Sequence, residues 1–453
     1  MISASRHGSL LLFGGLGVVS IATLLIEPSA LLGILILPFL VMAALLVRGV
    51  AHESKYAIYA VIFVAIFLVD STFRNRVYPN DQVDFQVVLK VGSWCVISLI
   101  ALVHTRVWLG QLLRPTNVPL LMFLAWLMFT TTYSPLPIYT AVCASSVIAF
   151  TIFCAYIFAR YDRVEIFAVM VVAITLFSVV SIVVYFTWPE FARYTYWLNE
   201  KRFVSNRLMG IGGSANGMGR LAAFGLVLII LYIREFHRIH RWFVPVATPI
   251  LALTVVMTDS RTSIGMVAAL GAVTFLFRWS RLPLAVLGVT LAVFAALVII
   301  PGGDEGLKVL SRNGDVSEVT SMTGRSTIWQ AIPGLVESRP WTGYGYASSI
   351  LVLPQHEREV GFATSHAHNL ALQLLLTTGW VGLGLFCLLM VTTVLRLSVA
   401  SDRTAWVMLA YVILNGLTES SAFSTLSNIC TVAFAIAVTL PPEQPDHEND
   451  PPY

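Results

Sequence analysis

Charged residues are scarce in this chain. Only 11% of its 453 residues are Asp, Glu, Lys or Arg, whereas soluble domains average about 25%. Hydrophobic residues make up 57% of the chain, which is more apolar surface than a globular core can bury. We therefore expect lipid to surround most of the protein, and the composition excludes an ordinary soluble domain.

Clustered cysteines are absent as well. None of the five lies in a Cys-x-x-Cys pair or beside a group of histidines, so neither a disulfide framework nor a zinc site is indicated. All five lie inside apolar segments: Cys95, Cys143, Cys154, Cys387 and Cys430.

Lysine is also rare, with four lysines against 24 arginines. The planar guanidinium group of arginine donates to a phosphate group in two places, whereas lysine acts as a point charge. Basic cytoplasmic loops explain part of this excess, and the remaining arginines suggest an anionic ligand.

Apolar stretches of the length that crosses a bilayer, about 17–25 residues, or slightly shorter, recur along the chain. They predict an all-α polytopic membrane protein with about 14 transmembrane helices (12–14), formed by one domain over residues 1–440. The predicted spans are 10–26, 29–47, 56–69, 86–104, 118–133, 138–159, 166–188, 216–233, 242–257, 262–277, 282–300, 370–395, 405–418 and 424–440.

Positive charge in alternate loops predicts the orientation, because cytoplasmic loops are enriched in Lys and Arg. Both termini are expected in the cytoplasm, and the acidic, proline-rich residues 441–453 are expected to be a disordered tail. The large loop 301–369, between the eleventh and twelfth spans, then faces the periplasm. The expected cytoplasmic charges are Arg48, Lys55, Arg106, Arg114, Arg160, Arg163, Arg234, Arg238, Arg241, Arg278, Arg281, Arg396 and Arg403.

The large loop contains one helical pattern. In RSTIWQAIPGLVE, the apolar residues Ile328, Ile332 and Leu335 recur at helical spacing. We expect a short amphipathic helix that lies on the membrane and ends before Pro340.

Four arginines expected on the outer side are candidates for binding an anion. Arg207 and Arg220 flank the glycine-rich segment GIGGSANGMG, where close backbone approach and a helix N-terminus favour an anion; snorkelling to the interface is the alternative. Arg261 lies in the turn MTDSRTS, where it could instead pair with Asp259. Arg325 begins the loop helix, where it could instead be a surface charge beside the lipid headgroups.

Histidines stand where the large loop re-enters the membrane. His366, His368 and Asn369 lie in SHAHN, and a neutral imidazole is well suited to accept a proton near pH 7. A metal site is not expected, because no third ligand is nearby in sequence. Glu419, in the outer turn TESSAF, could orient a histidine, balance an arginine, or be a plain interfacial carboxylate.

Several arginines and a candidate base thus converge on the outer leaflet. This combination fits a lipid-anchored donor with a diphosphate group, which the arginines would hold as it becomes the leaving group. The histidine would deprotonate an incoming sugar hydroxyl. No cofactor is needed, because cleavage of the glycosyl–phosphate bond drives the step.

The segment HNLALQLLLTTGWVG resembles the His-[Asn/Ser/Gln]-x9-Gly-x-x-Gly pattern of the bacterial O-antigen ligase and polysaccharide polymerase family, at His368, Asn369, Gly379 and Gly382. The preceding TGRSTIWQAIPGLVESRPWTGYGY resembles the Gly-Arg-x-x-x-Trp and Pro-x-x-Gly-x-Gly loop of exopolysaccharide polymerases. Together with the two arginine segments, the resemblance covers roughly residues 200–420. It implies His368 as base, with His366, Asn369 and the two glycines supporting the site. It also implies binding of an undecaprenyl-diphosphate donor by Arg207, Arg261 and Arg325, in the bacterial inner membrane.

The resemblance favours polymerisation of O-antigen or exopolysaccharide from undecaprenyl-diphosphate-linked glycan. Alternatives are ligation of the finished glycan to lipid A core or protein, and a lipid-linked oligosaccharide flippase. A flippase is less consistent with the large outer loop, the absence of internal repeats, and charges clustered at one face rather than at mid-membrane. The expected partners are the bilayer, the donor and acceptor glycans, and a chain-length regulator and flippase; nucleic acid is not expected.

Overall fold

The computed structural model describes residues 54–72, 85–198, 201–276, 325–360, 364–400, 402–424 and 426–441. The predicted spans 10–26, 29–47 and 282–300, the first part of the large loop and nearly all of the predicted tail lie outside the described residues.

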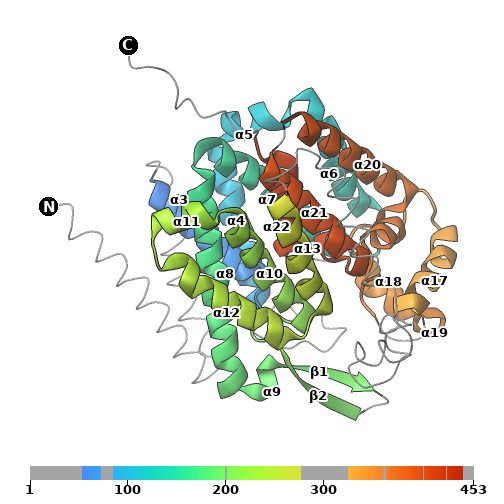
Figure 1. Ribbon diagram of the computed structural model, residues 1–453. Helices are drawn as coiled ribbons and strands as arrows, with labels where there is room; N and C mark the ends of the chain where they lie inside the picture. Colours follow the sequence, from blue (N-terminus) through green and yellow to red (C-terminus); the bar gives the residue numbers. More distant parts are fainter. Residues whose placement is uncertain are drawn as a thin grey trace.

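The described chain is mostly helical (Figure 1). Its longer helices are α3 (Lys55–Val69), α4 (Phe85–Val103), α6 (Val118–Phe129), α7 (Pro137–Arg160), α8 (Arg163–Thr187), α10 (Ala215–Leu231), α12 (Phe243–Thr258), α13 (Arg261–Leu276), α17 (Arg325–Glu337), α20 (Leu370–Ala400), α21 (Arg403–Thr418) and α22 (Ile429–Thr439). The shorter elements are α5 (Thr105–Leu112), α9 (Pro189–Ala192), α11 (Ile233–Ile239), α18 (Ser349–Gln355), α19 (Glu357–Val360), and the 3-10 turns Pro115–Asn117, Thr130–Thr132 and Ser421–Phe423.

Every predicted span within the described residues overlaps at least one of these helices, which supports the helical membrane class. The number of spans is a separate matter. By length and apolar composition, three described helices (α7, α8 and α20) can each cross a bilayer. The count rises to five if the bent pairs α4–α5 and α10–α11 are each one span. The predicted count of 14 therefore stays a prediction.

The segment before α10 departs from the all-helical prediction. Strands β1 (Arg193–Leu198) and β2 (Lys201–Leu208) form an antiparallel hairpin, in which Thr195 pairs with Val204 and Tyr196 with Phe203. The aromatic and β-branched residues of RYTYWL and KRFVSNRL favour strands. The hairpin and α9 lie at the bottom of the view in Figure 1, and α5 lies at the top.

Two helices form the centre of the bundle. Nearly every residue of α10 is buried, between α8, α12 and α13, and all of α22 is buried, between α7 and α21. A Cβ at Gly219 of α10 would lie 2.7 Å from Ser263 Oγ and 2.9 Å from Ser260 Cβ. Glycine therefore lets the start of α10 approach the turn between α12 and α13 closely.

The predicted loop helix exists as α17, but its apolar side does not lie on the membrane as expected. Ile328 and Ile332 are fully buried, and with Leu335 they pack against residues of α18, α19 and the start of α20. The loop has a small core of its own, which covers the helix face that would otherwise require lipid.

Helix α20 is broken at Gly379, whose φ of 66° lies in the left-handed region. A Cβ there would lie 2.2 Å from the carbonyl oxygen of Trp341. The loop backbone pairs with this break, since the Trp380 amide donates to Pro340 O at 2.9 Å and the Gly345 amide donates to Thr377 O at 2.8 Å. The Pro-x-x-Gly-x-Gly segment of the loop and the Gly-x-x-Gly segment of α20 therefore contact each other.

Candidate functional site

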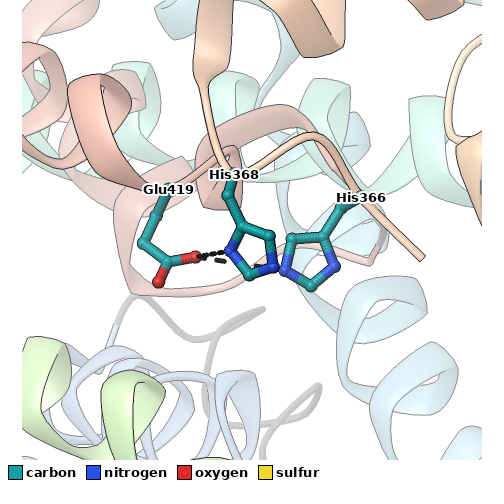
Figure 2. Close-up of side chains that lie close together, drawn as sticks. All are labelled: His366, His368 and Glu419. Atoms are coloured by element: carbon teal, nitrogen blue, oxygen red, sulfur yellow. Dashed lines mark hydrogen bonds and ion pairs between the residues drawn. The ribbon is translucent and has the colours of Figure 1, made fainter. Parts of the chain in front are cut away.

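The carboxylate of Glu419 is the centre of a polar cluster. Glu419 follows the last residue of α21 and is 5% exposed. Its Oε1 accepts hydrogen bonds from Arg325 Nη2 at 2.7 Å and Asn216 Nδ2 at 3.0 Å. Its Oε2 lies 3.0 Å from His368 Nδ1 and 3.9 Å from His366 Nε2. Figure 2 shows the Glu419 carboxylate joined by dashed lines to a ring nitrogen of each histidine.

Close packing of α21 against α20 brings these side chains together. A Cβ at Gly416 would lie 2.9 Å from Leu370 Cβ, so glycine lets the end of α21 approach the start of α20. Asn369 joins the same two helices: its Oδ1 accepts from the Leu372 amide at 3.1 Å, and its Nδ2 lies 3.4 Å from Leu417 O. Asn369 thus supports the site by capping α20.

His368 is held in a specific orientation. Its backbone φ is 49°, a left-handed conformation that non-glycine residues rarely adopt and that is frequent at functional sites. An ionised carboxylate only accepts hydrogen bonds, so in the neutral ring the proton belongs on Nδ1, facing Glu419. The lone pair is then on Nε2, which can accept a proton from a substrate.

The charges of the cluster are coupled. Burial lowers the pKa of His366 from its ordinary value of 6.5, and the neighbouring His368 lowers it further. Burial by itself raises the pKa of a carboxyl group, but His368 and Arg325 hold the pKa of Glu419 well below its usual range. At neutral pH, Glu419 is therefore ionised and His366 is neutral.

Arg207 reaches the cluster through a residue that the sequence analysis did not single out. Its Nε donates to Thr258 O at 2.9 Å, and its Nη2 donates to Asn216 Oδ1 at 2.7 Å. Asn216 in turn donates to Glu419. Asn216 lies inside the quoted GIGGSANGMG segment, but nothing in the sequence distinguishes it from a plain helix-start residue.

The two other predicted arginines lie near this cluster. Arg220 is 9% exposed, one turn into α10, and its Nε has no hydrogen-bond partner within the described part of the chain. Its positive charge interacts favourably with the negative charges of Glu419 and Asp70. Arg261 is the first residue of α13, and the hydroxyl of the next residue, Thr262, lies 3.4 Å from that of Thr418.

The predicted glycines do not lie beside the candidate base. Gly379 and Gly382 lie at the break in α20, where a Cβ on Gly382 would lie 2.1 Å from Thr378 Oγ1. In the segment before α10, Cβ atoms on Gly210 and Gly213 would meet the side chains of Ser181 and Thr72. All four glycines are therefore explained by packing against protein.

The cluster also contains three groups of the kind that bind metals. One ligand atom each from His366, His368 and Glu419 lies within 4.8 Å of the other two. A metal site was not expected because no third ligand lies near the histidines in sequence, but folding brings Glu419 to His368 across 51 residues.

Part of the chain is similar to known proteins. Residues 246–387 match the family described as O-Antigen ligase. A general O-oligosaccharyltransferase from Acinetobacter baylyi is 24% identical to the chain over 235 residues, which is 46% of this chain and 40% of that protein. The chain therefore matches less than half of that relative's length.

Proposed function

Because residues 246–387 match the O-antigen ligase family, we propose that the chain is a member of it and polymerises a surface polysaccharide by transferring glycan from an undecaprenyl-diphosphate donor to a sugar hydroxyl. Transfer of a glycan is the activity that the family description and the relative's name have in common. The donor, the acceptor and the polymerase reaction are the specific parts of the proposal.

One observation carries it: a single buried carboxylate contacts both a base and an arginine. Through Oε2, Glu419 fixes His368 with Nε2 available, and through Oε1 it fixes Arg325. A guanidinium group has five N–H donors, so contact with Glu419 still leaves Arg325 able to bind an anion. This arrangement suits a reaction in which a proton leaves one reactant while negative charge develops on the other.

The proposed step has a simple balance. The acceptor hydroxyl gives its proton to His368 Nε2, and its oxygen forms a bond to the anomeric carbon of the donor glycan. The bond between that carbon and the phosphate oxygen breaks, and undecaprenyl diphosphate leaves with the electron pair. Arg325, Arg207, Arg261 and Arg220 stabilise its charge, which is why we propose that no metal is required.

We further propose the bacterial inner membrane as the location, with both termini in the cytoplasm and the Glu419 cluster facing the periplasm. The basic loops carry this orientation. A flippase would deliver the lipid-linked units to this face, and a chain-length regulator would act on the product.

The ligase reaction uses the same donor and base but transfers a finished glycan to lipid A core or protein, and the relative's name, an oligosaccharyltransferase, makes it the second candidate. The flippase alternative is not favoured, because the family and the relative both point to glycan transfer.

Carrier-linked glycans from a deletion strain, separated by length and leaflet, test the proposal. We expect single repeat units on the outer leaflet and no long polymer. Full-length polymer on the carrier would identify a ligase, and units trapped on the cytoplasmic leaflet would identify a flippase. Complementation with His368→Ala should fail. His356→Ala is the matched control, because His356 lies in the same loop and bonds the Val352 carbonyl at 2.8 Å instead of Glu419.

A further inference from the structure

We propose that the cluster of His366, His368 and Glu419 binds a zinc ion from the periplasm, and that the bound ion reversibly inhibits the enzyme. The inhibition of the enzyme rests on the proposed function, but the binding of zinc does not. Zinc binding depends only on the arrangement of the three side chains.

The side chains are nearly arranged for a zinc ion. Zinc binds imidazole nitrogen and carboxylate oxygen at about 2.0–2.2 Å, so ligand atoms around a tetrahedral ion lie about 3.3 Å apart. His368 Nδ1 is 3.0 Å and His366 Nε2 is 3.9 Å from Glu419 Oε2. The three ligand atoms lie within 4.8 Å of one another, so His366 must move closer to complete three ligands, and the fourth position would remain for water.

Further contacts hold these ligands in place. The hydroxyl of Ser365 lies 2.9 Å from His366 Nδ1, the ring nitrogen that faces away from Glu419. Glu419 Oε1, the oxygen that does not contact the histidines, accepts hydrogen bonds from Asn216 and Arg325. Outer hydrogen bonds of this kind orient metal ligands in proteins.

The same surroundings select the type of ion. Arg325 and Arg220 oppose any cation at this position, so binding needs ligands that strongly prefer the metal. Two imidazoles and one carboxylate suit Zn²⁺ and Co²⁺, whereas Mg²⁺ and Ca²⁺ prefer more oxygen ligands. We expect selectivity for the former pair.

Zinc at this position would disable the proposed base. In the metal-free site, the ring proton of His368 faces Glu419 on Nδ1, and Nε2 accepts the substrate proton. A metal bound to Nδ1 displaces that proton, and the neutral ring then carries it on Nε2. The lone pair needed to deprotonate the acceptor hydroxyl is lost, and removal of zinc restores it.

The test uses the full-length protein in detergent after removal of metals with EDTA. Co²⁺ is the binding probe, because its coordination by nitrogen and oxygen gives visible absorption that Zn²⁺ abolishes on displacement. We expect one Co²⁺ per chain, with the spectrum lost in His366→Ala and retained in His356→Ala. In the transfer assay, excess Zn²⁺ should lower the initial rate at least tenfold, EDTA should restore it, and Mg²⁺ should have no effect.

An unchanged Co²⁺ spectrum in His366→Ala, or no spectrum in the wild-type protein, would overturn the site. Transfer that begins only after zinc is added would overturn inhibition and make the ion catalytic. A metal-free protein that binds Co²⁺ through the histidines but transfers no glycan would support the site and refute the proposed function, so the two failures are distinguishable.

Discussion

Helix α21 has a buried carboxylate at each end, each paired with an arginine, and the two differ in their other neighbours and in their position along the helix dipole. Asp402 precedes its first residue, accepts from the Ala405 amide at 3.0 Å and pairs with Arg163 at 2.9 Å. Glu419 follows its last residue and pairs with Arg325 at 2.7 Å and with His368. A helix dipole stabilises an anion at the first position and opposes one at the second.

The arginines near Asp402 have a structural role, because they also hydrogen-bond to backbone carbonyls. Arg163 also donates to Pro441 O at 3.2 Å, and the nearby Arg403 donates to Leu231 O at 2.9 Å, the last residue of α10. At the Glu419 end, the carboxylate instead holds a histidine whose other ring nitrogen is available. A buried acid at the unfavourable end of a helix, next to a histidine, is therefore the better guide to a site than arginine content.

The largest expected difference comes from neutralising each carboxylate without changing its shape. Glu419→Gln should lower the transfer rate about 10²–10⁴-fold, because His368 loses the group that fixes its base form. Asp402→Asn should instead destabilise the protein by about 3–5 kcal/mol, because Arg163 loses its buried partner. Transfer assays per folded molecule and thermal unfolding would separate the two effects. If the two variants had the same transfer rate per folded molecule and the same melting temperature, the proposed difference between the two helix ends would be wrong.

The arginine partners should differ in the same way, with a smaller effect. Arg325→Lys should lower kcat/KM for the lipid-diphosphate donor about 10–100-fold, because lysine cannot bind phosphate at two places. Arg163→Lys keeps a positive charge beside Asp402 and should lower the melting temperature with little change in kcat/KM. Steady-state kinetics with varied donor checks this, and a tolerated Arg325→Lys would argue against bidentate phosphate binding.

Asn216→Ala should have an intermediate effect on activity. Asn216→Ala removes the link between Arg207 and Glu419, and a hydrogen bond to a charged group contributes about 1.5–3 kcal/mol. We expect kcat/KM to fall about tenfold or more. Asn206→Ala, which removes the exposed contact with Arg193 in the hairpin, is the control. A loss of the same size in the control would indicate a general effect of the hairpin and not of the bridge.

The smallest expected effect concerns stability and pH. Because the folded-state pKa of His366 lies below its ordinary value of 6.5, the unfolded chain binds more protons just below that pH. Stability should therefore fall as the pH falls below about 6.5. Melting temperatures from pH 7.5 to 5 should show this slope, and His366→Gln should flatten it while His356→Gln should not. A slope unchanged in His366→Gln would assign the effect to other groups.

The length and periodicity of the apolar segments predicted much of the fold, because bilayer thickness and helical spacing leave a direct trace in sequence. The helix at Arg325 and the helical spans within the described residues follow from those patterns. The covered apolar side of α17 depends on packing against α18, α19 and α20, and the break at Gly379 depends on the close approach of the Trp341 backbone. No local pattern encodes either contact.

The site was partly predictable for a related reason. The candidate histidines and Glu419 stood out as polar residues at membrane entries, where such groups are costly. Their pairing depends on the close approach of Gly416 to Leu370, which is a property of packing. Asn216 gave no signal, since its importance comes entirely from lying between Arg207 and Glu419.

Transfer by purified His368→Ala tests the central claim most directly. The assay supplies undecaprenyl-diphosphate-linked glycan, and measures donor binding and product formation separately, with His356→Ala as control. We predict that His368→Ala binds donor normally, because Arg325 and Glu419 remain, but forms at least 10²-fold less product. Normal product formation by His368→Ala would contradict its assignment as the base.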